Sequence, residues 1–277
     1  MKILIGTPYL SSHFDSGLFW AKSFSELGHF VDLWDYRMNP YNKVSGFDLV
    51  IIFKGESIDP EILPRPRICY YPDDPNRIPG IENKLKLYDL VLTPVRPTPE
   101  GYEWLPTGWD ESVHRDMGYK GDRYEAVYIG TNNSDRKSHW ITKLAPDVVF
   151  GNGWGTIEPK HAIIIQPPVY HHDLTQALNK AYIAIDIHHG EVGVNRKLFE
   201  MIPCTFTLVD RVPGVEEIFG EVVTPLMSFR TVKDARDMIK YYLKNESERK
   251  EVWKAQKEKI QPYTYKEAAK KVLSFLK

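Results

Sequence analysis

The chain has 277 residues, of which 42% are hydrophobic and 13% aromatic, and its 36 Lys and Arg residues nearly balance its 37 Asp and Glu residues. This composition supports a folded core in one large or two modest domains and excludes an intrinsically disordered chain. A formal net charge of −1 argues against a protein that binds nucleic acid mainly through its overall charge, although it leaves local basic patches open.

The charge is unevenly distributed along the chain. Residues 1–120 carry a net charge of −4 (13 basic, 17 acidic), residues 121–232 carry −3 (10 and 13) and residues 233–277 carry +6 (13 and 7). The basic end has a helical pattern, so we interpret it as a solvated lysine face, with a site for a membrane or a polyanion as the alternative.

The sequence gives little indication of membrane insertion, of secretion or of disulfide chemistry. No apolar run reaches the roughly 18–20 residues of a membrane span, and the apolar start of the chain is too short for a signal-peptide core. Cys69 and Cys204 lie far apart in apolar contexts, which favours two buried free thiols over a disulfide or a metal site. We therefore expect a cytoplasmic protein without a transmembrane segment.

Short apolar runs alternate with amphipathic stretches in the first part of the chain. A helix is expected at residues 18–27, ended by Gly28. Strands are expected at residues 2–6, 29–34, 49–53, 67–71 and 90–93. Nearly all-apolar strands in this rhythm are typical of a parallel sheet buried on both faces. A proline-rich stretch follows at residues 93–99, and the polar segment 110–124 is the predicted linker.

The same pattern then starts again. Strands are expected at residues 126–129, 148–150, 163–165, 182–187, 205–209 and 222–223. Helices are expected at residues 138–144, 174–180, 195–202, 215–219, 233–244, 246–259 and 265–276. Two successive units of this kind predict an α/β protein with two Rossmann-like, doubly wound domains that face a cleft. We place these domains at residues 1–120 and 121–262, followed by a C-terminal helical segment at 263–277.

Two loops of the first domain contain candidate site residues. Gly17 precedes the first helix, where a glycine and a helix N-terminus allow an anion to approach the backbone, although a plain turn would also explain it. No G-x-G-x-x-G motif accompanies it, which argues against a dinucleotide site. Asp73 and Asp74 follow the fourth strand between two prolines; either carboxylate could orient a hydroxyl or act as a base, and an Asx-capped turn is the alternative.

The first loop of the second domain has the sequence GTNNSDRK and begins at Gly130. It follows a predicted strand and precedes a predicted helix. Small polar residues with an adjacent Arg136 and Lys137 suit the binding of a diphosphate, because guanidinium and ammonium groups neutralise phosphate charge. A solvated helix start is the alternative.

The richest pattern is the segment DIHHGEVGVNRKLFE at residues 186–200. Asn195 is a candidate N-cap of the helix that also carries Arg196 and Glu200, and a carboxylate there can accept two hydrogen bonds from a ribose diol. His188 is a candidate catalytic residue. Adjacent histidines on a strand point to opposite faces and no further ligands are suitably spaced, so we predict no metal site.

Taken in order, these residues resemble the GT-B nucleotide-sugar glycosyltransferases, and within their large retaining family the CgeB-like spore-maturation group. The resemblance also rests on the following stretches: LGH at 27–29, YPDDP at 71–75, LPTGWD at 105–110 with His114, GNGW at 151–154, NRKLFE at 195–200 and YTY at 263–265. It implies that the second domain binds the donor and that the final helix crosses back to the first domain. It also implies that Glu200 binds the nucleotide ribose, that Arg136 and Lys137 contact the diphosphate, and that Asn195 and Arg196 lie near the donor.

The resemblance implies transfer of a sugar from a nucleotide-diphosphate donor, with a UDP-sugar favoured, to a hydroxyl acceptor. Retention of configuration and independence of metal ions are expected by analogy, and no cofactor is implied. Asp73 or Asp74 would orient the acceptor, which could be a saccharide, a surface polymer or a hydroxymethylated base in viral DNA. Arg65, Arg67, Arg77 and Arg96 keep the DNA alternative open.

Two further interpretations belong to other classes. A non-catalytic sugar-nucleotide-binding or structural protein of the same fold is supported by Val192, which occupies a position where retaining relatives often carry a glutamate. A flavodoxin-like or periplasmic-binding protein would also contain two α/β domains, but it leaves the pattern at residues 195–200 and Arg136 unexplained.

Overall fold

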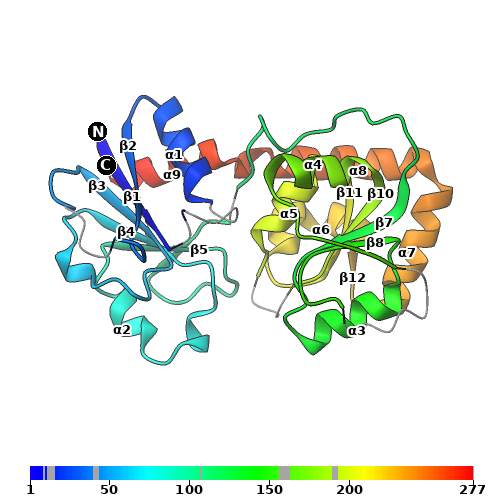
Figure 1. Ribbon diagram of the computed structural model, residues 1–277, viewed down its shortest axis with the longest axis horizontal. Helices are drawn as coiled ribbons and strands as arrows, with labels where there is room; N and C mark the ends of the chain where they lie inside the picture. Colours follow the sequence, from blue (N-terminus) through cyan, green and yellow to red (C-terminus); the bar gives the residue numbers. More distant parts are fainter. Residues whose placement is uncertain are drawn as a thin grey trace. The chain divides into compact units, whose positions relative to one another are not determined.

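A computed structural model describes residues 1–8, 10, 16–39, 44–106, 108–155, 163–188 and 193–276. The chain divides into two compact units, which we call unit 1 (residues 1–110 and 263–277) and unit 2 (residues 111–262). Each unit is a parallel β-sheet with helices packed against it (Figure 1). The predicted α/β class with two doubly wound, Rossmann-like units is therefore confirmed.

Unit 1 has a six-stranded sheet in which every described pair of neighbouring strands is parallel, in the order β2-β1-β3-β4-β5-β6. Its strands are β1 (Lys2–Thr7), β2 (Phe30–Asp35), β3 (Leu49–Phe53), β4 (Arg67–Tyr70), β5 (Leu90–Thr93) and β6 (Tyr102–Trp104). Its α-helices are α1 (Gly17–Glu26), α2 (Ile81–Leu85) and α9 (Tyr265–Ser274). Strand β3 is fully buried, as its apolar sequence predicts for a central parallel strand.

The last helix, α9, belongs to unit 1 and packs on α1 (Figure 1). The rings of Phe19 and Tyr265 stack with their centroids 5.1 Å apart, and the Tyr265 amide donates a 3.0 Å hydrogen bond to the carbonyl of Trp109. A Cβ at Gly108 would lie only 2.4 Å from the Tyr263 carbonyl oxygen, so the two chain segments are in direct backbone contact there. The prediction that the C-terminal helix returns to the first domain is confirmed.

Unit 2 has a second six-stranded parallel sheet, in the order β12-β11-β10-β7-β8-β9. Its strands are β7 (Tyr124–Ile129), β8 (Val148–Phe150), β9 (Ile164–Gln166), β10 (Ala181–Asp186), β11 (Phe206–Asp210) and β12 (Ser228–Phe229). Its α-helices are α3 (Asp135–Leu144), α4 (His171–Asn179), α5 (Arg196–Met201), α6 (Val215–Met227), α7 (Val232–Lys244) and α8 (Glu246–Ile260).

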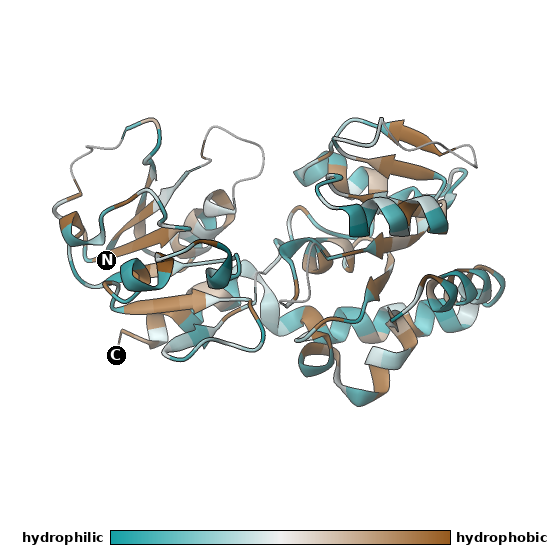
Figure 2. Cartoon of the chain, turned by 90° about the horizontal axis from the view of Figure 1, so that it is seen from below, coloured by the Kyte–Doolittle hydropathy of each residue, from teal (hydrophilic) through white to brown (hydrophobic). Residues whose placement is uncertain are grey.

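The sheet of unit 2 has an apolar core on each face. Ala126 and Tyr128 of β7 lie in one core with residues of α3, α7 and α8, whereas Val127 and Ile129 lie in the other with residues of α4 and α5. Successive strand side chains point to opposite faces, so one strand contributes to both cores. Figure 2 shows the result: the strands are brown, and the helices around them carry teal, hydrophilic surfaces.

Some local predictions differ from the structure. Residues 222–223, predicted as a strand, lie within α6, so that prediction is wrong; Gly220, at φ 75°, interrupts the same helix where the predicted one ended. The short strands β6 and β12 were not predicted. Cys69 and Cys204 are free and buried, as expected, and burial raises the pKa of the Cys204 thiol to about 12. Across the described ranges, no helix is long and apolar enough to cross a membrane.

Candidate functional site

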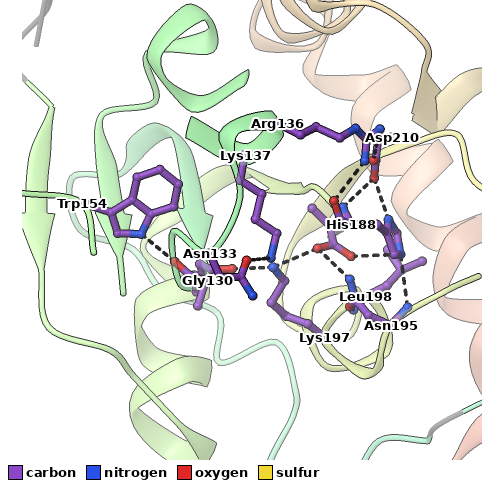
Figure 3. Close-up of polar contacts among 12 residues, drawn as sticks. Gly130, Asn133, Arg136, Lys137, Trp154, His188, Asn195, Lys197, Leu198 and Asp210 are labelled. Atoms are coloured by element: carbon purple, nitrogen blue, oxygen red, sulfur yellow. Dashed lines mark hydrogen bonds and ion pairs between the residues drawn. The ribbon is translucent and has the colours of Figure 1, made fainter. Parts of the chain in front are cut away.

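Tight backbone contacts shape the loop between β7 and α3 of unit 2. The indole Nε1 of Trp154 donates a 2.6 Å hydrogen bond to the carbonyl of Gly130, the first loop residue (Figure 3). A Cβ at Gly130 would lie 2.7 Å from the Tyr128 hydroxyl, and a Cβ at Gly151 would lie 2.1 Å from the Gly130 carbonyl oxygen. Both glycines are therefore needed for this close approach, which fixes the chain entering α3.

The first turn of α3 carries the two predicted cations. Ser134 is the N-cap, and its hydroxyl accepts a 3.3 Å hydrogen bond from the Lys137 amide, as a small polar N-cap residue is expected to do. The side chains of Arg136 and Lys137 therefore both project from the first turn of α3, close to the carboxyl end of β7. The structure brings these two predicted residues together with Gly130.

The start of α5 is held from two directions. Asn195 is the N-cap, and its side-chain oxygen accepts a 3.1 Å hydrogen bond from the Leu198 amide. The Asn195 amide in turn donates to Nε2 of His188 at 3.1 Å. The predicted cap is therefore present, and it lies against the predicted catalytic histidine.

The buried His188 and Asp210 form a network with the half-buried Arg136 at the carboxyl ends of β10 and β11 (Figure 3). One oxygen of Asp210 lies 2.6 Å from Nδ1 of His188 and 3.0 Å from its amide nitrogen. Arg136 contacts the other Asp210 oxygen at 2.8 Å and donates to the His188 carbonyl at 3.0 Å. Because Nε2 accepts from an amide, the network assigns the ring proton to Nδ1, and both ring nitrogens are engaged.

Asp186 and Lys197 form a second buried pair in the same region. The Lys197 ammonium lies 2.9 Å from an Asp186 oxygen, donates to the Ile129 carbonyl at 2.5 Å and sits 4.8 Å from the centre of the Tyr128 ring. Burial alone would favour the neutral forms, yet each charge stabilises the other, so the pKa of Asp186 is lowered and the pKa of Lys197 is raised. This one ammonium group connects β7, β10 and α5.

Lys137 differs from the other two cations of this cluster. Among the described residues, the structure shows no carboxylate within ion-pair distance of its ammonium group. Its ammonium donates to the side-chain oxygen of Asn133 at 3.0 Å, and the residue is buried. Burial, followed by repulsion from Lys197, lowers the pKa of Lys137 to about 8. Counted over the described residues, three cations (Arg136, Lys137, Lys197) therefore meet two buried carboxylates, Asp186 and Asp210, which leaves an excess of one positive charge.

Glu200 lies one helical turn further along α5 and is also buried. Its carboxylate accepts from Nε of Arg196 at 3.0 Å and lies 3.9 Å from Nε2 of His114. The structure therefore brings Arg196 and Glu200 together on one helix. Sequence reasoning had included His114 in the family resemblance but assigned it no role.

A pocket of about 530 Å³ opens beside Arg136 and Asp210. Its other described lining residues come from the β11–α6 loop, the start of α6 and the end of β12. They are Arg211, Val212, Pro213, Gly214, Glu216, Glu217, Phe229 and Arg230. The cation cluster and this pocket thus lie side by side at the carboxyl edge of the sheet.

The predicted residues of unit 1 have different surroundings. Asp73 forms a 2.8 Å ion pair with Lys54, whose own backbone is left-handed at φ 68°. Asp74 caps the 3₁₀ turn Pro75–Arg77 by accepting the Asn76 amide at 3.0 Å, which agrees with the alternative of a capped turn. Gly17 is the first residue of α1 and is buried.

Arg65, Arg67 and Arg96, three of the arginines that kept a DNA acceptor open, make contacts within unit 1. Arg67 is buried and donates to the backbone carbonyls of Leu63 and Leu87. Arg65 pairs with Asp89, and the Arg96 guanidinium lies 4.1 Å from the centre of the Trp104 ring. These contacts account for the three side chains without a nucleic acid.

The sequence did not assign three residues of this cluster to the site: Asp186, Lys197 and Asp210. Asp186 and Asp210 each end an apolar strand, the same signal that singled out Asp73. Lys197 adjoins the predicted Arg196. Within the ranges that the structure describes, no group of three or more His, Cys, Asp or Glu residues is arranged to hold a metal ion. His189 and Val192 lie outside the described residues.

The family comparison gives one match. A protein family described as glycosyl transferase-like matches residues 136–274, which is half of the chain and includes α3, α5 and β11. A search of curated proteins finds no match.

Several solved structures have the same fold. T4 phage β-glucosyltransferase, which has also been solved with UDP and Mn²⁺, is 13% identical over 99% of both chains, with a TM-score of 0.70. Anabaena Alr3699/HepE, solved with UDP and glucose, is 11% identical over 100% of this chain and 99% of that one, with a TM-score of 0.70. An α-glucosyltransferase solved with UDP-glucose and DNA is 11% identical over 99% of this chain and 98% of that one, with a TM-score of 0.62. These similarities confirm the predicted GT-B fold.

Proposed function

The chain belongs to the glycosyl transferase-like family, and on that premise we propose that it transfers a sugar from a UDP-sugar donor to a hydroxyl acceptor. The observation that carries this proposal is the excess positive charge of the cluster formed by Arg136, Lys137 and Lys197. A buried cation without a matching carboxylate is costly unless an anion completes the site. A nucleoside diphosphate supplies that anion, and two proteins of the same fold have been solved with UDP.

In this proposal Arg136 and Lys137 bind the diphosphate, with Gly130, Asn195 and Arg196 near it. Negative charge develops on the leaving diphosphate as the bond to the sugar breaks, and preorganised cations stabilise that charge. Glu200 would accept hydrogen bonds from the ribose hydroxyls. His188 would hold the start of α5 by accepting from the Asn195 amide at Nε2, while its Nδ1 contacts Asp210.

We further propose that unit 1 binds the acceptor and that Asp73 orients its hydroxyl. Gly17, at the start of α1 in the same unit, is proposed to contact the donor and not the acceptor. Retention of configuration, independence of metal ions and membership of the CgeB-like group are parts of the same proposal, and they rest on the sequence resemblance. Comparing activity in EDTA with activity in Mn²⁺, and recording the anomer formed by NMR, tests the first two.

The experiment that tests the donor site is titration of the protein with UDP in a calorimeter, followed by a Glu200→Gln variant. We expect the wild-type protein to bind UDP and the variant to bind it at least about tenfold more weakly, because a carboxylate accepts stronger hydrogen bonds than an amide. Glu221→Gln, at an exposed position, is the matched control. Full affinity and activity in Glu200→Gln would refute this site.

A DNA acceptor is a second candidate, because structures of the same fold include a DNA-modifying β-glucosyltransferase. Transfer to hydroxymethylated DNA, compared with transfer to saccharides from the same donor, decides between the two acceptor classes. Binding to DNA that weakens steeply as salt increases would favour the DNA candidate.

The non-catalytic alternative makes a different prediction. A protein that has kept the fold and the donor site but has lost turnover would bind UDP and neither transfer nor hydrolyse any donor. A panel of UDP-, GDP-, ADP- and TDP-sugars, assayed for release of the nucleoside diphosphate, separates it from an enzyme.

A further inference from the structure

We infer that Asp210 is an internal competitor for the donor diphosphate: its carboxylate occupies Arg136 and thereby weakens the binding of UDP. This inference rests on the proposed function, because it takes Arg136 to be a diphosphate contact. It assigns a positioning and affinity-setting role to a residue that the sequence did not single out.

The geometry places Asp210 at the centre of the site. It ends β11 and is 1% exposed, so its charge is shielded from water. One oxygen accepts from the amide and from Nδ1 of His188, at 3.0 and 2.6 Å. The other oxygen contacts Arg136 at 2.8 Å. The His188 carbonyl also accepts from Arg136, so the guanidinium is held from two sides.

Arg136 remains accessible despite these contacts. Its side chain is 30% exposed, and it lines the pocket at this edge of the sheet. A diphosphate that reaches Arg136 must therefore share the guanidinium with a carboxylate that is already in place. The buried negative charge of Asp210 also repels the incoming phosphates, and such repulsion is strong in a site with little water.

A competing carboxylate has a functional use. Binding that is equally strong for substrate, transition state and product lowers KM without raising kcat, and the UDP product keeps the diphosphate that Arg136 contacts. Asp210 keeps Arg136 in place when no donor is bound and limits how tightly UDP is held afterwards. Asp186 neutralises Lys197, which leaves Lys137 as the cation that is not neutralised by a described carboxylate.

The test is an Asp210→Asn variant titrated with UDP. Asparagine has the same shape, keeps an oxygen for His188 and removes the charge that faces Arg136. We expect the Kd for UDP to fall about tenfold, equivalent to about 1.4 kcal/mol, with a parallel fall in the donor KM. Glu221→Gln is the matched control, because Glu221 is an exposed carboxylate of α6 that does not line the pocket; its Kd is expected to stay within about twofold.

A double-mutant cycle shows whether the effect acts through Arg136. In an Arg136→Met background, Asp210→Asn should change the Kd for UDP less than it does in the wild-type background. Unchanged or weaker UDP binding by Asp210→Asn would overturn the inference, because Asp210 would then only support Arg136 and His188.

A crystal structure of the wild-type protein with UDP tests the inference without a variant, should Asp210→Asn not fold. Contact between Arg136 and the diphosphate supports the competition, and an Arg136 side chain that contacts only Asp210 overturns it. The two levels of proposal can be told apart: a wild-type protein that binds no UDP refutes both, whereas UDP binding without tightening in Asp210→Asn refutes only the role of Asp210.

Discussion

The two units share a six-stranded parallel sheet, but they place charge differently at the carboxyl ends of their strands. In unit 1 the Lys54–Asp73 pair is partly solvated, with side chains 26% and 38% exposed. In unit 2 the side chains of Asp186 and Asp210 are 0% and 2% exposed. Burying a charge has a large desolvation cost, so such groups are typically kept where a site needs a fixed field. The contrast supports the proposal that unit 2, in which the cations Arg136, Lys137 and Lys197 lie close to these two carboxylates, binds the donor.

The largest expected effect is on the free energy of unfolding, when an ion pair of each unit loses its lysine. Lys197→Met leaves Asp186 buried without its ammonium partner, and we expect the free energy of unfolding to fall by about 3–5 kcal/mol. Lys54→Met removes the equivalent partner from a partly solvated pair and should cost about 1 kcal/mol or less. Urea denaturation followed by tryptophan fluorescence measures both. A smaller loss in Lys197→Met/Asp186→Asn than in Lys197→Met would confirm the cause, and equal losses in the two single variants would break the comparison.

The second largest effect is expected on the Kd for UDP, when the excess positive charge of unit 2 is removed. Lys137→Met is expected to raise the Kd for UDP about 10- to 100-fold, because hydrogen bonds to charged groups contribute about 1.5–3 kcal/mol. Lys143→Met, at an exposed position of the same helix, is the control for calorimetry. The unfolding free energy of Lys137→Met should be maintained or increased, because a buried charge has been removed. Unchanged UDP binding would contradict the assignment of Lys137.

The affinity for UDP should also depend on pH. The pKa of Lys137 is lowered to about 8 by burial and by Lys197, so its ammonium form dominates below pH 8 and is lost as the pH rises. We expect the Kd for UDP to increase about tenfold between pH 7 and pH 9.5, a range in which the terminal phosphate stays ionised. Lys137→Arg should remove this dependence, because arginine keeps its charge. The same pH profile in both proteins would assign the titration to another group.

The smallest effects are expected in unit 1. Asp74→Ala removes the cap of a short turn and should lower the free energy of unfolding by about 1 kcal/mol, with no change in the Kd for UDP. Asp73→Asn should lower kcat while leaving donor affinity within about twofold. If Asp73→Asn weakens UDP binding as strongly as Lys137→Met does, the proposal that unit 1 binds the acceptor and unit 2 the donor is wrong.

Most of the fold could be predicted because most strands are apolar runs that alternate with amphipathic helices. The prediction was wrong at residues 222–223, where two adjacent valines suggest a strand but belong to the helix that resumes after Gly220. Strand β12 has only two residues, too few for a pattern. Helices and strands can be identified from the length of an apolar run and from the alternation of apolar and polar residues. Very short segments take their structure from neighbours that are distant in sequence.

The site was predictable only in part, for a related reason. Arg136, Lys137 and Asn195 could be predicted because each lies near the start of a helix that follows a strand. Asp210 could not, because one acidic residue at the end of an apolar run is equally compatible with an ordinary strand end. Its partners are Arg136 of α3 and His188, which follows β10. The order β11-β10-β7 that brings them together follows from the sheet and not from the chain order.

The return of α9 to unit 1 has a consequence for synthesis. Residues 111–262 form unit 2 as an insertion between two pieces of unit 1, whose second piece begins at Tyr263. A ribosome therefore delivers all of unit 2 before it delivers Tyr265, the residue that stacks on Phe19. Domains generally fold as they emerge. The six strands of the unit 1 sheet are synthesised before unit 2, but α9 is synthesised after it, so the packing of α9 on α1 can form only once the whole of unit 2 has been made.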